Sequence, residues 1–94
     1  MFWETTRKIT VDAAAFADQK TVHAVLKEAL DSEAYLGNNL DALSDVLTTL
    51  GRKTKITVLH FAAAEKALGD YAARLALVLA SAASANPRLT VEFD

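Results

Sequence analysis

The chain has 94 residues, of which 52% are hydrophobic and 23% are charged, and its formal net charge is −2. This length allows one folded domain, residues 1–94, and the composition excludes an intrinsically disordered chain. The near-neutral charge and the lack of a basic stripe argue against direct binding to nucleic acid or to an anionic membrane. No cysteine is present, which excludes disulfides, thiolate metal sites and a cysteine nucleophile.

The N-terminal segment MFWETTRK has neither the basic region nor the apolar region of a signal peptide. The longest apolar run, residues 75–80, is too short to cross a membrane. We therefore expect a cytoplasmic protein that is a monomer when free. Trp3 either packs on the domain or lies loose, and the sequence does not decide between the two.

The first two predicted elements are a strand and a helix. Residues 7–12 alternate between apolar and polar side chains, which is typical of a strand with one buried face. A helix is predicted over residues 20–30, where apolar side chains recur at helical spacing. Asp18 is the expected N-cap of this helix, and Thr21 is the alternative.

The stretch YLGNNLDALSDVLTTLG, residues 35–51, predicts a loop that leads into an amphipathic helix. Asn38 or Asn39 is expected to cap this helix, because either side chain can accept a hydrogen bond from the first turn. Gly51 is the expected C′ residue, since helices commonly end at a glycine in the left-handed conformation. The predicted buried stripe consists of Leu40, Leu43, Val46, Leu47 and Leu50.

A strand and an alanine-rich helical segment follow this helix. Residues 56–60 form the second expected strand. Residues 61–85 are expected to be helical and to be split at Gly69-Asp70, with Asp70 as the N-cap of the longer last helix.

A proline and an alternating segment close the chain. Asn86-Pro87 should end the last helix, because proline cannot continue a helix and restricts the residue before it. Residues 89–93 alternate as a third strand. Helical crossovers between successive strands imply parallel pairing with right-handed connections. The predicted fold is therefore α/β, with a three-stranded parallel sheet packed on one face against about four helices.

Motifs for catalysis or metal binding are not evident in the sequence. The three glycines, at 37, 51 and 69, do not form a phosphate-binding loop, and no His or Asp/Glu spacing reproduces a metal signature. We therefore expect no cofactor and no metal ion. His23 lies beside the apolar stripe of its helix and His60 ends a strand, so a structural or surface role is the simpler interpretation for each.

The acidic residues gather in one part of the chain. Residues 28–51 contain five Asp and Glu and no Lys or Arg, so this block carries −5 and the rest of the chain carries +3. Asp41 is favourable near the positive end of the helix dipole, but Asp45 gains little there and repels Asp41 by roughly 0.2–0.5 kcal/mol. With Tyr35 and Leu36 beside them, these acids form the apolar centre and charged surroundings of a recognition surface for a basic partner.

Two other interpretations of the aspartates stay open at this point. The first is a solvated polar face that has no partner. The second is a hydrolase that uses Asp41 and Asp45 as paired carboxylates, as glycosidases do. A hydrolase requires a concave site around both carboxylates, whereas side chains four residues apart on a helix project outward side by side.

The same stretch resembles the signature segment of the barstar family, inhibitors of small secreted bacterial ribonucleases. The family pattern is two aromatics, Gly, any residue, Asn-Leu-Asp-Ala-Leu, Trp and Asp. Leu36 replaces the second aromatic and Ser44 replaces the Trp. The order and length of the elements agree from Arg7 to Asp94. The matching positions are Tyr35, Gly37, Asn39, Leu40, Asp41, Ala42, Leu43 and Asp45.

The resemblance implies an inhibitor and not an enzyme. In the family this helix and the loop before it enter the ribonuclease active site, so Asp45 would take the place of an RNA phosphate, with Asp41 beside it. The family's acid on the last helix has no counterpart in LASAASA. The implied partner is a basic secreted ribonuclease bound 1:1, and the alternative is a different nuclease toxin or another basic protein. The implied contact residues are Tyr35, Leu36, Gly37, Asn38, Asn39, Asp41, Ala42, Ser44 and Asp45, with Tyr35, Leu36, Asp41, Ser44 and Asp45 facing outward.

Overall fold

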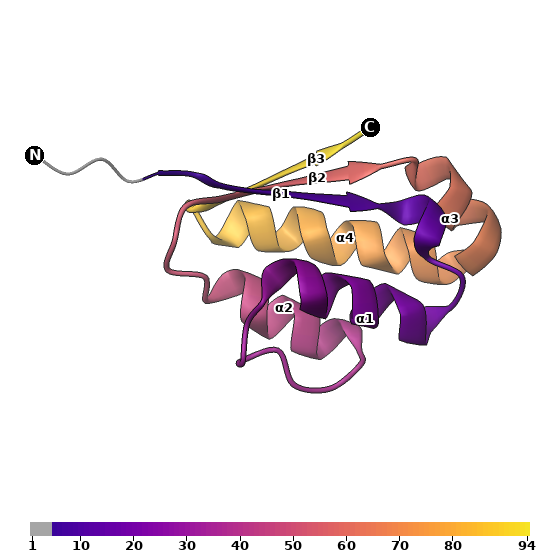
Figure 1. Ribbon diagram of the computed structural model, residues 1–94, viewed down its shortest axis with the longest axis horizontal. Helices are drawn as coiled ribbons and strands as arrows, with labels where there is room; N and C mark the ends of the chain where they lie inside the picture. Colours follow the sequence, from indigo (N-terminus) through magenta and orange to yellow (C-terminus); the bar gives the residue numbers. More distant parts are fainter. Residues whose placement is uncertain (1–4) are drawn as a thin grey trace, which may run out of the picture.

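The computed structural model describes residues 5–94, so Trp3 lies outside the described residues (Figure 1). Three parallel strands form one sheet in the order β1-β2-β3: β1 (Arg7–Asp12), β2 (Thr54–Leu59) and β3 (Leu89–Phe93). The helices are α1 (Gln19–Leu30), α2 (Leu40–Thr48), α3 (Phe61–Leu68) and α4 (Asp70–Ala85), with a 3-10 helix η1 (Ala13–Ala15) after β1. The predicted α/β fold, with a three-stranded parallel sheet and four helices, is confirmed.

The helices α1, α2 and α4 lie along one face of the sheet, and α3 lies at the end where β1 and β2 finish (Figure 1). Buried residues alternate with exposed or half-buried ones along β1 and β2, as expected for a sheet that is covered on one side. Ile9 and Val11 of β1 and Ile56 and Val58 of β2 belong to the main apolar cluster, together with buried leucines of α1, α2 and α4.

Two of the predicted N-caps are confirmed. Asp18 accepts hydrogen bonds from the Thr21 backbone N at 2.8 Å and from the Thr21 Oγ1 at 2.7 Å, and these bonds lower the pKa of the Asp18 carboxyl. Asn39 caps α2, because its Oδ1 accepts from the Ala42 backbone N at 2.8 Å. Both side chains bind orphan N–H groups of the first helical turn, so local sequence alone fixes where α1 and α2 begin.

The prediction for the end of α2 is wrong. The helix ends at Thr48, and Gly51 is not in the left-handed conformation. The hydroxyls of Thr48 and Thr49 donate back to carbonyls of the last turn, Thr48 to Ser44 O at 2.8 Å and Thr49 to Asp45 O at 2.7 Å. A distant side chain completes this end of the helix, since Asn86 Nδ2 donates to the carbonyls of Leu47 at 2.9 Å and of Leu50 at 3.1 Å.

The predicted cap of α4 is also wrong. Asp70 is the first residue of α4, and Gly69 occupies the N-cap position without a side-chain hydrogen bond. Gly69 also ends α3, because its N–H donates to Glu65 O at 3.0 Å. With φ of 57° and ψ of −128°, this shared position is in a region of backbone space that glycine tolerates best.

The second strand is longer at its start than the predicted residues 56–60. β2 begins at Thr54, whose backbone N donates to Arg88 O at 2.7 Å, and it ends at Leu59. His60 follows in the left-handed conformation, with φ of 56°, and its Nδ1 lies 3.0 Å from Asp12 Oδ1 at the end of β1. The hydrogen bond from His60, with one from the Ala14 N–H, lowers the pKa of the Asp12 carboxyl.

None of the helices in the described part of the chain is both long enough and apolar enough to cross a membrane.

Asn86 makes a testable contribution to the position of α2. Its amide is buried and binds the carbonyls of Leu47, in α2, and of Leu50, just after it, while its Oδ1 accepts from the Arg88 N–H at 3.0 Å. Asn86→Ala should lower the free energy of unfolding by roughly 1–3 kcal/mol, because it leaves these groups without partners. Urea unfolding followed by circular dichroism measures the change. Ser84→Ala, at an exposed position of the same helix end, is the control, and equal stabilities of the two variants would contradict the assignment.

Candidate functional site

The helix α2 presents its two aspartates to solvent. Asp41 and Asp45 are exposed, and Leu43, Val46 and Leu47 are buried on the opposite side of the helix, with Leu40 and Leu50 packed half-buried at its ends. Neither aspartate makes an ion pair with any residue of the described range 5–94. The predicted outward orientation of both carboxylates is confirmed, and their charges are not neutralised within the described chain.

The remaining predicted contact residues lie on the same stretch with differing exposure. Leu36 is 74% exposed, and Gly37, Asn38 and Asn39 are also exposed. Gly37 has φ of 89°, a left-handed value that strains a residue with a side chain. Ala42 and Ser44 are half-buried on α2. Glu28, from the same acidic block of the sequence, lines a separate cavity of about 350 Å³ beside β1, so the block does not form a single face.

The prediction that Tyr35 faces outward is wrong. Tyr35 is 3% exposed, and its hydroxyl is hydrogen-bonded to His23 Nδ1 on α1. The ring packs edge-on against the His23 ring, with centroids 6.0 Å apart, and Lys27 Nζ lies 5.5 Å from the Tyr35 centroid. Because His23 offers a buried partner for the hydroxyl, the aromatic ring turns into the core and leaves Leu36 as the exposed apolar residue of the loop.

One face of α1 holds the loop that precedes α2. Gln19, His23 and Lys27 are four residues apart, so they lie above one another on the helix. Gln19 Nε2 donates to the carbonyl of Asn38 at 3.1 Å, and Lys27 Nζ donates to Asn38 Oδ1 at 2.9 Å. With the bond from His23 to Tyr35, these contacts hold the loop, residues 31–39, at its middle and near the start of α2. Asn38, the alternative predicted cap, is therefore a partner of α1.

His23 also connects the loop to α4. Its Nε2 lies 2.6 Å from the hydroxyl of Tyr71, and the imidazole is fully buried. Burial, together with the positive charge of Lys27, lowers the pKa of His23, and burial raises the pKa values of Tyr35 and Tyr71. The ring is therefore neutral at neutral pH, with one nitrogen donating to a hydroxyl and the other accepting from one.

Sequence reasoning assigned His23 a structural or surface role but did not identify its two tyrosine partners. The signal for the loop contact was the recurrence of Gln19, His23 and Lys27 at four-residue spacing, which places three polar side chains on one face of the helix. The contact with Tyr71 had no such signal, because that residue lies 48 positions away in the chain.

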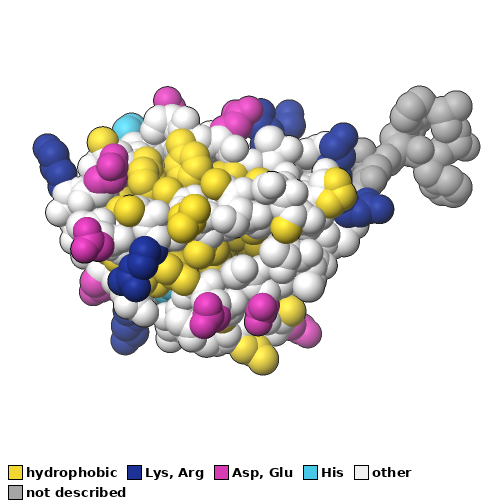
Figure 2. Space-filling model, turned by 180° about the vertical axis from the view of Figure 1, so that it is seen from behind, with side chains coloured by type: hydrophobic (Ala, Val, Ile, Leu, Met, Phe, Trp, Pro, Cys, Tyr) yellow, Lys and Arg dark blue, Asp and Glu magenta, His cyan; other side chains and the backbone are white. Residues whose placement is uncertain are grey.

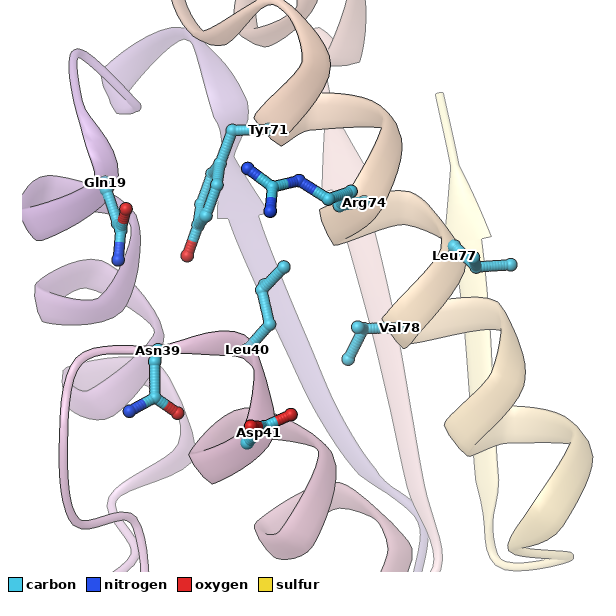
Figure 3. A pocket seen from close by; sticks show the side chains of 8 residues that line it. All are labelled: Gln19, Asn39, Leu40, Asp41, Tyr71, Arg74, Leu77 and Val78. Carbon is cyan, nitrogen blue, oxygen red and sulfur yellow. The ribbon is translucent and has the colours of Figure 1, made fainter.

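A cleft of about 460 Å³ lies where the starts of α1 and α2 face α4 (Figure 3). It is lined by Gln19, Asn39, Leu40, Asp41, Tyr71, Arg74, Leu77 and Val78. Asp41 lines this cleft and Asp45 does not, so the two carboxylates do not flank one cavity as the paired acids of a glycosidase do. Residues 5–94 also hold no group of three or more His, Asp or Glu side chains placed to bind a metal ion.

Comparison with known families identifies the chain. The family model described as Barstar (barnase inhibitor) matches residues 6–94. The chain belongs to the barstar family. A relative from Bacillus subtilis (strain 168), named "Putative ribonuclease inhibitor YrdF", is 37% identical over 67 residues, which cover 70% of this chain and 74% of the relative. Barstar family membership supports a barnase-inhibitor-like role and not that of an enzyme, and it confirms the resemblance seen in the stretch 35–51.

The hydroxyl of Tyr35 should contribute to stability. Tyr35→Phe leaves the buried His23 Nδ1 without its partner, so the free energy of unfolding should fall by roughly 1–3 kcal/mol. Leu36→Ala, at the exposed neighbouring position, should change it by less than about 0.5 kcal/mol. Urea unfolding at pH 7.5 compares the two, and a Tyr35→Phe variant as stable as the parent would show that the hydrogen bond contributes nothing.

The lowered pKa of His23 predicts a pH dependence of stability. The unfolded chain takes up a proton on His23 at about pH 6.5, whereas the folded protein does so only at its lower pKa. The contribution of His23 to the free energy of unfolding should therefore be constant above about pH 6.5 and fall below it, by up to about 1.4 kcal/mol per pH unit, until the folded pKa is reached.

Measuring the free energy of unfolding of the parent and of His23→Gln across this pH range separates the contribution of the histidine from that of the carboxylates. The glutamine keeps a donor and an acceptor but does not titrate, so its stability should depend less on pH just below 6.5. Lys27, Tyr35 and Tyr71, which surround the ring, are unchanged in both proteins. Parallel curves for the parent and the variant would exclude His23 as the source of the dependence.

Proposed function

We propose that this protein inhibits a small basic bacterial ribonuclease by binding its active site 1:1. The observation that carries the proposal is Asp45, an exposed carboxylate without an ion-pair partner in residues 5–94, on a helix of a barnase-inhibitor family member. Asp41 lies one turn away and also makes no ion pair within residues 5–94. Local helix energetics disfavour this pair of like charges, so a basic partner supplies the interaction that the free protein lacks.

The mechanism is substitution of a carboxylate for an RNA phosphate. A ribonuclease binds phosphate with cationic side chains in a partly dry pocket, where charged hydrogen bonds are strong. Asp45 enters that pocket, and Asp41 strengthens the negative potential from the preceding turn. RNA is then excluded both by the occupied phosphate site and by the loop and helix that cover it.

The proposed contact surface comprises the exposed loop and the outer side of α2. Leu36 is its apolar contact, and the left-handed Gly37 lets the chain turn into the helix. Tyr35 is only 3% exposed, which leaves little area for a partner. Its role is therefore to support the loop from the core side. The polar and small residues of this surface are Asn38, Asn39, Ala42 and Ser44.

A client other than barnase is the second candidate. Residues 35–45 contain one aromatic side chain, Tyr35, and it is turned into the core. The surface therefore offers Leu36 and Ser44 where the family pattern has aromatic residues. Such a surface suits a partner with a smaller apolar recess, in another nuclease toxin or another basic protein.

We also infer that the complex forms in the cytoplasm, because an inhibitor that protects the producing cell must meet the enzyme before export.

Asp45→Ala tests the proposal directly. Removal of one partner from a desolvated charge pair should weaken the complex by about 2–5 kcal/mol. This general range rests in part on measurements made on complexes of the barstar family. The fold should be unchanged, because the side chain is exposed. Inhibition titrations against a panel of small basic ribonucleases that includes barnase measure the loss.

Asp94→Ala is the control for net charge, since Asp94 is an exposed acid after β3. It should leave the affinity nearly unchanged at 0.15 M salt, where distant exposed charges are largely screened. If Asp45→Ala and Asp94→Ala inhibited every susceptible enzyme equally well, α2 would not be the inhibitory surface.

A further inference from the structure

Arg74 places a positive charge beside the acidic surface of α2. It lines the same cleft as Asp41, from the facing helix α4 (Figure 3). Within residues 5–94 its guanidinium makes no ion pair, with Asp41 or with any other acid. The cleft therefore carries two opposite charges, and neither neutralises the other through direct contact.

The guanidinium of Arg74 packs against its neighbour on α4. The guanidinium carbon lies 5.3 Å from the centroid of the Tyr71 ring, a cation–π distance. Tyr71 is itself fixed by the hydrogen bond of its hydroxyl to His23. A cation that is already oriented loses less side-chain entropy when a partner binds it, so Arg74 is suited to recognition.

Apolar side chains surround this cation. Leu40 and Val78 are half-buried in the cleft, and Leu77 is 66% exposed at its rim. Figure 2 shows that hydrophobic side chains spread widely over this side of the molecule, with acidic side chains along its lower margin. Apart from Asp70 and Arg74, α4 contains no charged residue, so its outer side offers a partner mostly small and apolar contacts.

The cleft is continuous with the proposed ribonuclease-binding surface. Asn39 and Asp41 belong to both, and Asp45 is one helical turn, about 5.4 Å, further along α2. A standard protein interface covers about 800 Å² on each partner, far more than one helical turn. A ribonuclease that covers Asp41 and Asp45 over such an area extends onto the cleft that Asp41 lines, and there it leaves Arg74 without a counter-charge unless its own surface supplies a negative group.

We propose that Arg74 determines partner specificity by pairing with an acidic side chain that the ribonuclease presents next to its basic active site. Beside that acid, an apolar side chain of the enzyme packs on Leu40, Leu77 and Val78. This inference rests on the proposed inhibitory function and adds a second requirement to it. The partner must present a cation to α2 and an anion to α4, and an enzyme with a cation at both places is rejected.

The sign of a charge reversal tests the inference. Arg74→Glu and Lys66→Glu change the net charge by the same amount, and Lys66 is an exposed residue of α3 outside the cleft. General attraction to a basic enzyme predicts that both variants bind as well as the parent or better. Our proposal predicts that Arg74→Glu weakens inhibition at least about tenfold while Lys66→Glu does not. The neutral variant Arg74→Gln should show a smaller loss of the same sign.

Inhibition titrations of barnase and a panel of related small basic ribonucleases supply the measurement, with Asp45→Ala in the same series. If Asp45→Ala weakens inhibition but Arg74→Glu behaves as Lys66→Glu does, the role of Arg74 is refuted and the inhibitory function stands. If Arg74→Glu improves inhibition, the partner presents a cation to the cleft and the role is also refuted. If no enzyme of the panel is inhibited by the parent protein, the proposed function itself fails and the inference fails with it.

Discussion

The buried imidazole of His23 is the contact on which the position of the proposed binding loop depends. One ring binds Tyr35 of the loop and Tyr71 of α4, so α1, the loop and α4 meet at a single group. A neutral imidazole has one donor and one acceptor, which two hydroxyls can satisfy together. A protonated ring would have two donors in a buried site, and burial disfavours that state. The neutral ring therefore ties the loop to α4, in addition to the contacts that Gln19 and Lys27 make with Asn38.

The helix α2 is fixed at both ends by amide side chains that belong to different parts of the chain. Asn39 binds the first turn locally, and Asn86, from the connection between α4 and β3, binds the carbonyls of Leu47 in the last turn and of Leu50 just after it. Leu43, Val46 and Leu47 attach the helix to the core between these ends. Such anchoring tolerates the repulsion between Asp41 and Asp45, which is small compared with the burial of three apolar side chains. It also presents the carboxylates in a preorganised geometry, which reduces the entropy lost when a partner binds.

The features that could be predicted from the sequence are those that depend on near neighbours in the chain. Alternation and helical spacing predicted the strands, the helices and the outward aspartates. The caps were also predictable, because Asp18 and Asn39 each accept a hydrogen bond from a backbone N–H only three positions further along the chain. The predictions that failed depend on distant partners. The helix α2 ends at Thr48 and not at Gly51, and Asn86, more than 30 residues away, binds the carbonyls of Leu47 and Leu50 at this end. Tyr35 is buried because His23 and Tyr71 complete a polar site in the core, which no local pattern reveals.

The burial of Tyr35 has a consequence for recognition. An aromatic ring that the family pattern places in the contact loop here supports the fold, so the loop presents Leu36 as its apolar contact. The same hydrogen-bonded histidine positions Tyr71, on which the Arg74 guanidinium rests. Loop and cleft therefore share one support, and a change at His23 alters both together. In the proposed complex, affinity from the acids of α2 and discrimination at Arg74 are coupled through this buried ring, although neither surface contains it.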